Sequence, residues 1–154
     1  MSGGGKHGIV WTDGACSSNG KSGARAGVGN YWGEGNPYNV SAPVSGGRHT
    51  NNAAEIEAAT RAVQGGRAQG YDSITIKTDS EFLTNSQNKW VPKWESNGWR
   101  TANNEPVKNR AELSDLNREI RASGMEVKFE HVPGHAGNVG NEAADRLAKR
   151  GAQY

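Results

Sequence analysis

The stretch that decides the fold is residues 50–66, TNNAAEIEAATRAVQGG. Its small and apolar residues recur every three to four positions, as in an amphipathic helix, at Ala54, Ile56, Ala58, Ala59, Ala62 and Val63. Thr50 or Asn51 is a suitable N-cap, and the pair Gly65-Gly66 predicts the end of the helix. Glu55 therefore falls in the first helical turn.

Three short apolar or alternating runs precede this helix and predict strands over residues 8–12, 27–32 and 39–44. Residues 33–37, GEGNP, are turn-forming and separate the second run from the third. The first run ends in Asp13-Gly14, so Asp13 directly follows the predicted strand. Together the three runs predict an antiparallel meander.

In the rest of the chain, stretches with the periodicity of a helix alternate with stretches typical of a strand. The pattern predicts a strand over residues 73–78 that delivers Asp79 at its end, a short helix from Ser80, a helix over residues 107–123, a strand over residues 126–132 and a helix over residues 140–150. This order predicts an α/β domain with a mixed sheet of about five strands flanked by helices.

Length and composition indicate one domain. We expect residues 8–154 to form it, with residues 1–7 as a disordered, Gly-rich tip. No run reaches the roughly 20 apolar residues of a membrane span, and residues 1–8 lack the core of a signal peptide. We therefore expect an intracellular monomer without a membrane partner, in the cytoplasm, with the nucleus or an organelle as alternatives. Cys16, the single cysteine, can form no internal disulfide.

Four carboxylates stand where the predicted elements can bring them together: Asp13, Glu55, Asp79 and Asp145. Each alone has an ordinary explanation as a turn former, helix N-terminal charge, strand cap or solvated helix face. Side by side they would repel one another unless divalent cations lay between them, and oxygen ligands favour Mg²⁺ or Mn²⁺ over zinc. The net charge of +2 becomes +6 outside these acids, which suits a polyanionic substrate, although scattered basic residues are usually only a solvated surface.

The strings around these acids are more specific. Thr12-Asp13-Gly14, residues 50–55 (TNNAAE), Thr78-Asp79-Ser80 and residues 131–145 (HVPGHAGNVGNEAAD) resemble type 1 ribonuclease H in order and spacing, over roughly residues 8–152. The resemblance implies the ribonuclease H-like fold and an endonuclease that uses two Mg²⁺ ions, or Mn²⁺, to hydrolyse the RNA strand of RNA/DNA hybrids. It also implies 5′-phosphate and 3′-hydroxyl ends. Residues before Ile9 lack the basic and aromatic content of the hybrid-binding module that many relatives carry.

The resemblance also implies a role for each acid. Asp13 would bridge both ions, Glu55 and Asp79 would hold mainly the leaving-group side, and Asp145 would bind the ion that activates water. His135 lies between Gly134 and Gly137. It would assist proton transfer or product release, and the ordinary alternative is a surface histidine.

Two further groups match family positions that contact the hybrid. The RNA-strand group, expected to sense 2′-hydroxyls, is Gly14, Cys16, Ser17, Asn19, Asn51 and Asn52. The DNA-strand group, a phosphate pocket with one aromatic side chain against deoxyribose, is Arg48, Thr50, Asn109 and Trp90. Turn chemistry would explain Asn19 equally well, and we expect Trp94 and Trp99 to pack against the core.

Two other functions compete with the nuclease interpretation. The first is a module of the same fold that binds nucleic acid without cutting it, and the complete carboxylate set argues against this. The second is an integrase-like or exonuclease-like phosphotransfer enzyme. Such enzymes share strand-end carboxylates but lack the run over residues 131–145 and the Asn-rich segments.

Overall fold

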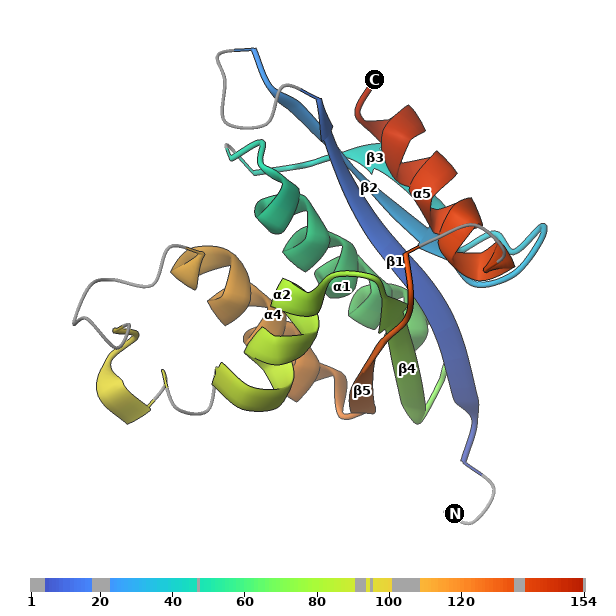
Figure 1. The fold of residues 1–154 in the computed structure, drawn as a ribbon. Helices are drawn as coiled ribbons and strands as arrows, with labels where there is room; N and C mark the ends of the chain where they lie inside the picture. The colour runs from blue at the N-terminus through green and yellow to red at the C-terminus, as the bar shows by residue number, and fades with distance from the viewer. Residues whose placement is uncertain are drawn as a thin grey trace.

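One mixed five-stranded sheet organises the computed structural model, which describes residues 5–17, 23–46, 48–90, 94, 96–100, 109–134 and 138–153. The strands are β1 (His7–Ser17), β2 (Arg25–Tyr31), β3 (Val40–Pro43), β4 (Ser73–Thr78) and β5 (Glu126–His131). Their order is β3-β2-β1-β4-β5, with β2 antiparallel to β1 and β3, and with β4 parallel to β1 and β5 (Figure 1). The predicted meander and the predicted fold class are confirmed.

Helices lie on both faces of this sheet (Figure 1). They are α1 (Asn51–Ala68), α2 (Glu81–Asn85), the π-helical turn η1 (Ser86–Trp90), α4 (Arg110–Ser123) and α5 (Val139–Gly151). Helix α1 packs against one face together with α4, and α5 covers the opposite face over β1, β2 and β3. The described helices include none long and apolar enough to cross a membrane.

Helix α1 begins as predicted and ends later than predicted. Thr50 is the N-cap, and its hydroxyl accepts the N–H of Ala53 at 3.1 Å. The predicted end at Gly65-Gly66 is wrong, because the helix continues to Ala68. Gly66 is buried against Ile74 and Met125, so its missing side chain serves close packing, and the left-handed residue after the helix is Gly70, with φ +80°.

Strand β1 corrects a second expectation. The strand end predicted at Thr12 is wrong, because the strand runs through Asp13 and Gly14 to Ser17 and pairs with β2 along this length. A Cβ on Gly14 would lie 2.6 Å from the backbone nitrogen of Glu55. Glycine therefore lets β1 pass directly against the first turn of α1, and Asp13 lies in mid-strand rather than at a strand end.

The core lies between the sheet and the pair α1 and α4. Its largest fully buried side chains include Ile56, Ile74, Ile76, Leu83, Leu113 and Leu116. Trp99 is buried in this cluster and Trp94 packs beside it, with ring centroids 6.2 Å apart, so the expectation for these two residues is confirmed. Helix α4 is described from Arg110, and the earlier residues 107–108 of the predicted helix lie outside the described residues.

The contact between α5 and β2 leaves no room for a side chain. A Cβ on Gly29 would overlap the backbone of Ala144 and Ala148 in α5. Gly29→Ala should therefore lower the free energy of unfolding by about 3 kcal/mol, the upper range for overpacking. Urea denaturation measures this, with Gly46→Ala as the control, because a Cβ on Gly46 meets nothing within 4 Å. Equal stability of the two variants would contradict the close contact.

Candidate active site

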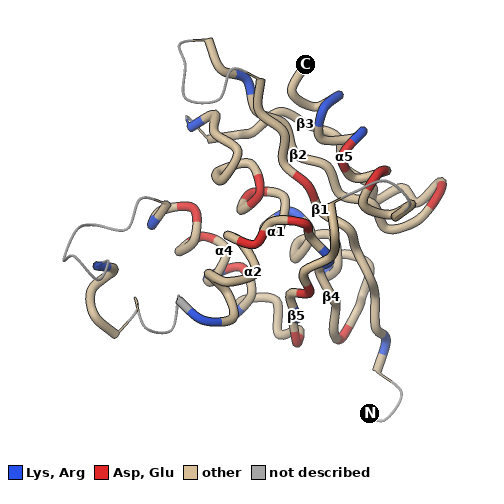
Figure 2. The backbone as a smooth tube through the Cα atoms, viewed as in Figure 1, with Lys and Arg blue, Asp and Glu red and all other residues tan. Residues whose placement is uncertain are grey.

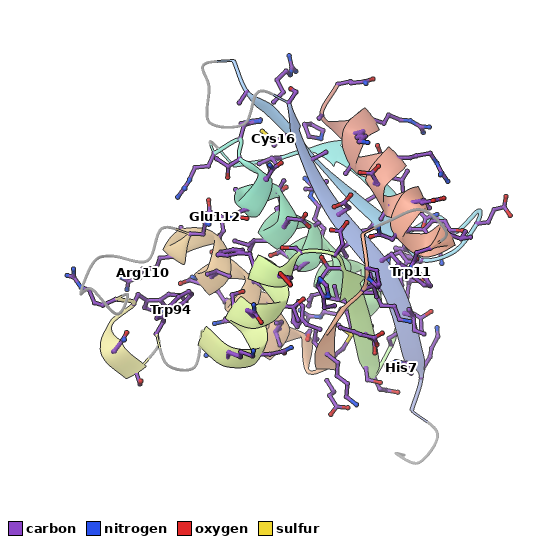
Figure 3. The ribbon with its side chains drawn as sticks, in the orientation of Figure 1. His7, Trp11, Cys16, Trp94, Arg110 and Glu112 are labelled. Carbon is purple, nitrogen blue, oxygen red and sulfur yellow. The ribbon has the colours of Figure 1, made fainter. Side chains whose placement is uncertain are left out.

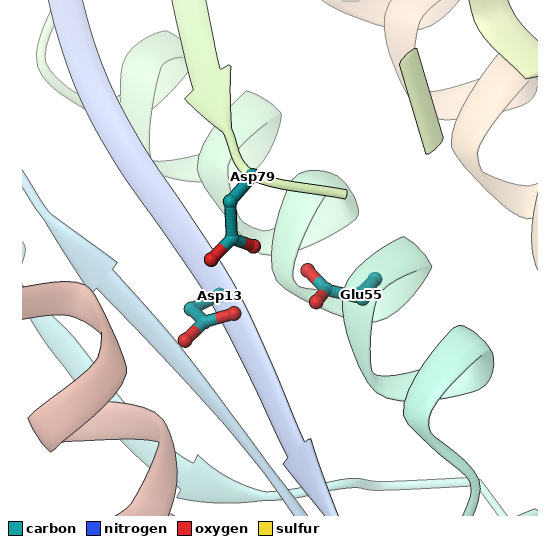
Figure 4. A group of neighbouring side chains, drawn as sticks. All are labelled: Asp13, Glu55 and Asp79. Atoms are coloured by element: carbon teal, nitrogen blue, oxygen red, sulfur yellow. The ribbon is translucent and has the colours of Figure 1, made fainter. Parts of the chain in front are cut away.

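Three carboxylates from separate elements point toward one another (Figure 4). Asp13 comes from β1, Glu55 from α1 and Asp79 directly follows β4. Glu55 lies just past the first turn of α1, which holds no acidic residue, so the predicted place in the first turn is wrong. Oxygen atoms of the three side chains all lie within 4.8 Å of one another. The structure thus brings together three of the four acids that the sequence analysis selected, and they form the carboxylate cluster.

Burial makes this cluster electrostatically unfavourable by itself. Asp13 is 5% exposed and Glu55 is 8% exposed. Burial first, and then the charges of Asp79 and Asp145, raise the pKa of Asp13 to about 8. Burial also raises the pKa of Glu55, followed by the charge of Asp13, and the N–H of Gly14 opposes this shift. One Glu55 oxygen, Oε1, is buried without a hydrogen-bond partner.

Asp145 lies at the margin of the cluster. It lies on α5 close enough to Asp13 for its carboxylate to contribute to the raised pKa of Asp13. Its oxygens are not in the group within 4.8 Å. Its carboxylate also pairs with Nζ of Lys149 at 3.0 Å. Lys149 was not selected from the sequence, although the i,i+4 spacing from Asp145 is a signal for this pair.

Asn141 is a second polar residue that the sequence analysis did not select. It is 5% exposed, and its Nδ2 donates to Oδ2 of Asp79 at 3.5 Å. Its place four residues before Asp145 puts both side chains on one face of α5, which was visible in the sequence. Gly134 also lies close to Asp79, since a Cβ there would be 2.8 Å from Oδ2. His135 lies outside the described residues.

Most of the RNA-strand group lies where β1 ends beside the start of α1. Sγ of Cys16 donates to the carbonyl of His49 at 3.2 Å, and the N–H of Ala26 donates to Nδ1 of His49 at 3.0 Å (Figure 3 labels Cys16). Gly14 and Ser17 lie on the same stretch of β1, while Asn51 and Asn52 open α1. Burial raises the pKa of Cys16, so this thiol is not an activated nucleophile. Asn19 lies outside the described residues.

Three residues of the DNA-strand group, Arg48, Thr50 and Asn109, lie at the N-termini of α1 and α4. Nε of Arg48 lies 3.7 Å from Oε2 of Glu112 in α4, and Thr50 caps α1 (Figure 3 labels Glu112). Asn109 directly precedes α4, is 5% exposed, and has a buried Oδ1 without a hydrogen-bond partner. Glu112 was not selected from the sequence, where nothing in the spacing connects it with Arg48. The side chain of Trp90 lies outside the described residues.

Comparison with known proteins identifies the family. The RNase H family model matches residues 5–153. The chain belongs to the RNase H family. The resemblance seen in the sequence is thereby confirmed, and the match includes every strand and helix that carries the carboxylate cluster.

Relatives of this RNase H-family chain agree with the match. Mouse Ribonuclease H1 is 47% identical over 94% of the chain and 50% of its own length, so the chain spans about half of that relative. Ribonuclease H of Francisella philomiragia is 40% identical over 92% of the chain and 88% of its own length. Among solved structures, a foamy viral protease-reverse transcriptase in complex with an RNA/DNA hybrid has a TM-score of 0.74 at 26% identity, over 94% of this chain and 20% of that one.

The family depends on divalent metal ions, and the carboxylate cluster fits such an ion. The donors are all carboxylate oxygens, which hard divalent cations prefer. The unpartnered Oε1 of Glu55 and the raised pKa of Asp13 both indicate negative charge that the surrounding protein does not balance.

Asp13→Asn should stabilise the metal-free protein at alkaline pH. The folded-state pKa of about 8 lies above the ordinary 3.8, so stability from protonated Asp13 is present at low pH and is lost as pH rises from about 4 to 8. Asparagine cannot ionise, and the variant should therefore gain several kcal/mol over wild type near pH 9, at about 1.4 kcal/mol per pKa unit, and almost nothing near pH 4.

Urea unfolding in EDTA across this pH range measures the difference. Glu34→Gln, at an exposed residue of the β2–β3 connection, is the control, and its free energy of unfolding should stay close to that of wild type across this pH range. A pH-independent effect of Asp13→Asn would contradict the electrostatic description of the cluster.

Proposed function

We propose that this RNase H-family chain is an endonuclease that hydrolyses the RNA strand of RNA/DNA hybrids and leaves 5′-phosphate and 3′-hydroxyl ends. The observation that carries the proposal is the convergence of Asp13, Glu55 and Asp79 in a chain whose family match spans residues 5–153. The name of the mouse relative and the hybrid bound by the foamy viral enzyme support the substrate.

The cofactor in this proposal is a pair of Mg²⁺ ions, with Mn²⁺ as the alternative. When bound, two such ions supply an activated water and neutralise charge on the leaving oxygen. Asp13 would be shared by both ions, Glu55 and Asp79 would hold the leaving-group side, and Asp145 would hold the water side. Glu55 and Asp13 gain most from the added positive charge, because both are buried with raised pKa values.

Other residues of the chain keep these ligands in place. The amide of Asn141 donates to Asp79 and so fixes one of its oxygens. Lys149 holds Asp145 at the margin of the cluster through an exposed ion pair, which is weak enough to exchange. His135 is proposed to move a proton or help release product, because an imidazole changes its charge near neutral pH.

Strand recognition follows from the two groups beside the cluster. Short polar groups at Gly14, Cys16, Ser17, Asn19, Asn51 and Asn52 are proposed to contact the RNA strand and its 2′-hydroxyls. Arg48, Thr50, Asn109 and Trp90 are proposed to hold the DNA strand. The arrangement of the N-termini of α1 and α4 supports a phosphate site there, since the N–H groups of a helix start attract anions.

Cleavage of three matched substrates tests the proposal. With Mg²⁺ the protein should cut a labelled RNA/DNA hybrid, and should cut neither duplex DNA nor single-stranded RNA of the same sequence, because only the hybrid offers 2′-hydroxyls opposite deoxyribose. EDTA should abolish the cut. Hybrid cleavage that persists in EDTA, or preferred cutting of duplex DNA, would refute the proposed mechanism or substrate.

The division of roles gives a second test. Asp13→Asn should lower kcat by about a thousandfold or more, because several kcal/mol of metal-derived stabilisation are lost. His135→Ala should lower kcat by about a hundredfold at most, the lower range for one proton-transfer group. Single-turnover kinetics on the hybrid measure both. A larger loss for His135→Ala than for Asp13→Asn would overturn the assignment.

A further inference from the structure

A hollow of about 170 Å³ lies between α5 and the β2–β3 hairpin, away from the groups assigned above. Tyr31, Ala143 and Leu147 give it apolar lining, and Arg146, Arg150 and Glu34 give it charged lining. These six residues define the α5 hollow. Nothing in the proposed function uses it.

The two arginines of the α5 hollow form no ion pair with any carboxylate that the structure describes. Within the described part of the chain, neither Arg146 nor Arg150 has a side-chain ion pair, whereas three other arginines pair with carboxylates: Arg48, Arg61 and Arg118. Their i,i+4 spacing makes them neighbours on one helix face, where like charges repel. Basic residues line the second half of α5 in Figure 2. Two adjacent guanidinium groups that form no ion pair favour an anion, and their planar shape matches a phosphate.

Both walls of the α5 hollow are held by hydrogen bonds. In the hairpin, Oδ1 of Asn39 accepts the N–H of Trp32 at 2.6 Å, and its Nδ2 donates to the carbonyl of Gly33 at 2.8 Å. The hydroxyl of Ser41 in β3 donates to the carbonyl of Leu147 in α5 at 2.7 Å. The hollow is therefore formed before a ligand arrives, which lowers the cost of binding.

The lining indicates the chemistry of the ligand. The volume lies below the roughly 300–1,000 Å³ of most small-molecule sites, so it suits one unit of a polymer. An aromatic ring beside cationic groups is typical of sites for single-stranded nucleic acid, where a base stacks on the ring and phosphates meet the cations. Glu34 disfavours a bare inorganic anion, but its carboxylate can accept hydrogen bonds from the N–H groups of a base.

We propose that the α5 hollow binds one unpaired nucleotide of a single strand that extends from the hybrid held at the carboxylate cluster. This inference rests on the proposed function. Arg146 directly follows Asp145, and Arg150 lies about 6 Å beyond Arg146 along the helix axis, so one rigid helix links the hollow to the cluster. A strand that leaves the cluster along α5 meets the hollow next.

Binding of blunt and extended hybrids tests the inference. Fluorescence anisotropy in EDTA, where nothing is cut, compares a blunt hybrid with hybrids that carry an extension of about six nucleotides, RNA or DNA, at either end. At least one extension should raise wild-type affinity by about fivefold, as one stacked base does. Arg146→Gln/Arg150→Gln should remove that gain and flatten the salt dependence by about 1.4 in log–log slope, the value for two phosphate contacts.

Matched controls separate this effect from general charge loss. Arg67→Gln/Lys128→Gln also removes two exposed cations, one in the last turn of α1 and one in β5, and should keep the gain. Tyr31→Leu should reduce the gain with little change in the salt slope, because it removes stacking and no charge.

Each outcome decides the inference. No gain from any extension, or a gain that survives Arg146→Gln/Arg150→Gln, would overturn it. Cleavage of the blunt hybrid with Mg²⁺ is measured in parallel, so that loss of the proposed function is recognised separately from failure of the hollow.

Discussion

The burial of Asp13 beside Glu55 is the constraint on which the rest of the structure depends. Two carboxylates at this depth repel each other and lose their hydration, and burial is the largest cause of both raised pKa values. Such a pair persists only in a scaffold that the rest of the core stabilises. Gly14 permits the approach of β1 to α1, and the small residues along α1 keep the helix close to the sheet. The fold thereby holds carboxylates whose negative charge the protein does not balance, and a bound divalent cation would neutralise that charge.

Much of this could be predicted from the sequence, because periodicity reports which face of an element is buried. The order of the elements and the helix from Asn51 could be predicted from where the spacing of apolar residues changes between that of a strand and that of a helix. The two wrong boundaries, at Asp13-Gly14 and at Gly65-Gly66, have a common cause. A glycine marks either a turn or a close contact, and only the position of a distant element decides between them. Gly14 faces the start of α1, and Gly66 faces Met125 as well as Ile74 in β4, so each glycine contacts a residue outside its own element.

The residues of the candidate site also fall into those that the local sequence reveals and those that only a contact between elements reveals. The acids of the carboxylate cluster could be predicted because the residues next to each of them in the sequence form a recognisable string. Asn141 and Lys149 lie one helical turn from Asp145 on either side, so spacing along one helix could have revealed them. The pair of Arg48 and Glu112 joins residues 64 positions apart, and no periodicity connects them. Contacts between elements are what the sequence of one chain does not display.

The backbone contact of α5 with β2 has a consequence for when the four acids come together. Asp145 comes close to Asp13 only when α5 has docked on the sheet. At the glycines of β2 the helix backbone contacts the strand directly, with no side chains between them. Because α5 is the last element of the fold, it is also the last to leave the ribosome. A nascent chain that has formed its sheet and α1 holds three of the acids and lacks the fourth. The complete set of carboxylates therefore arises only after α5 has been synthesised and has docked on the sheet.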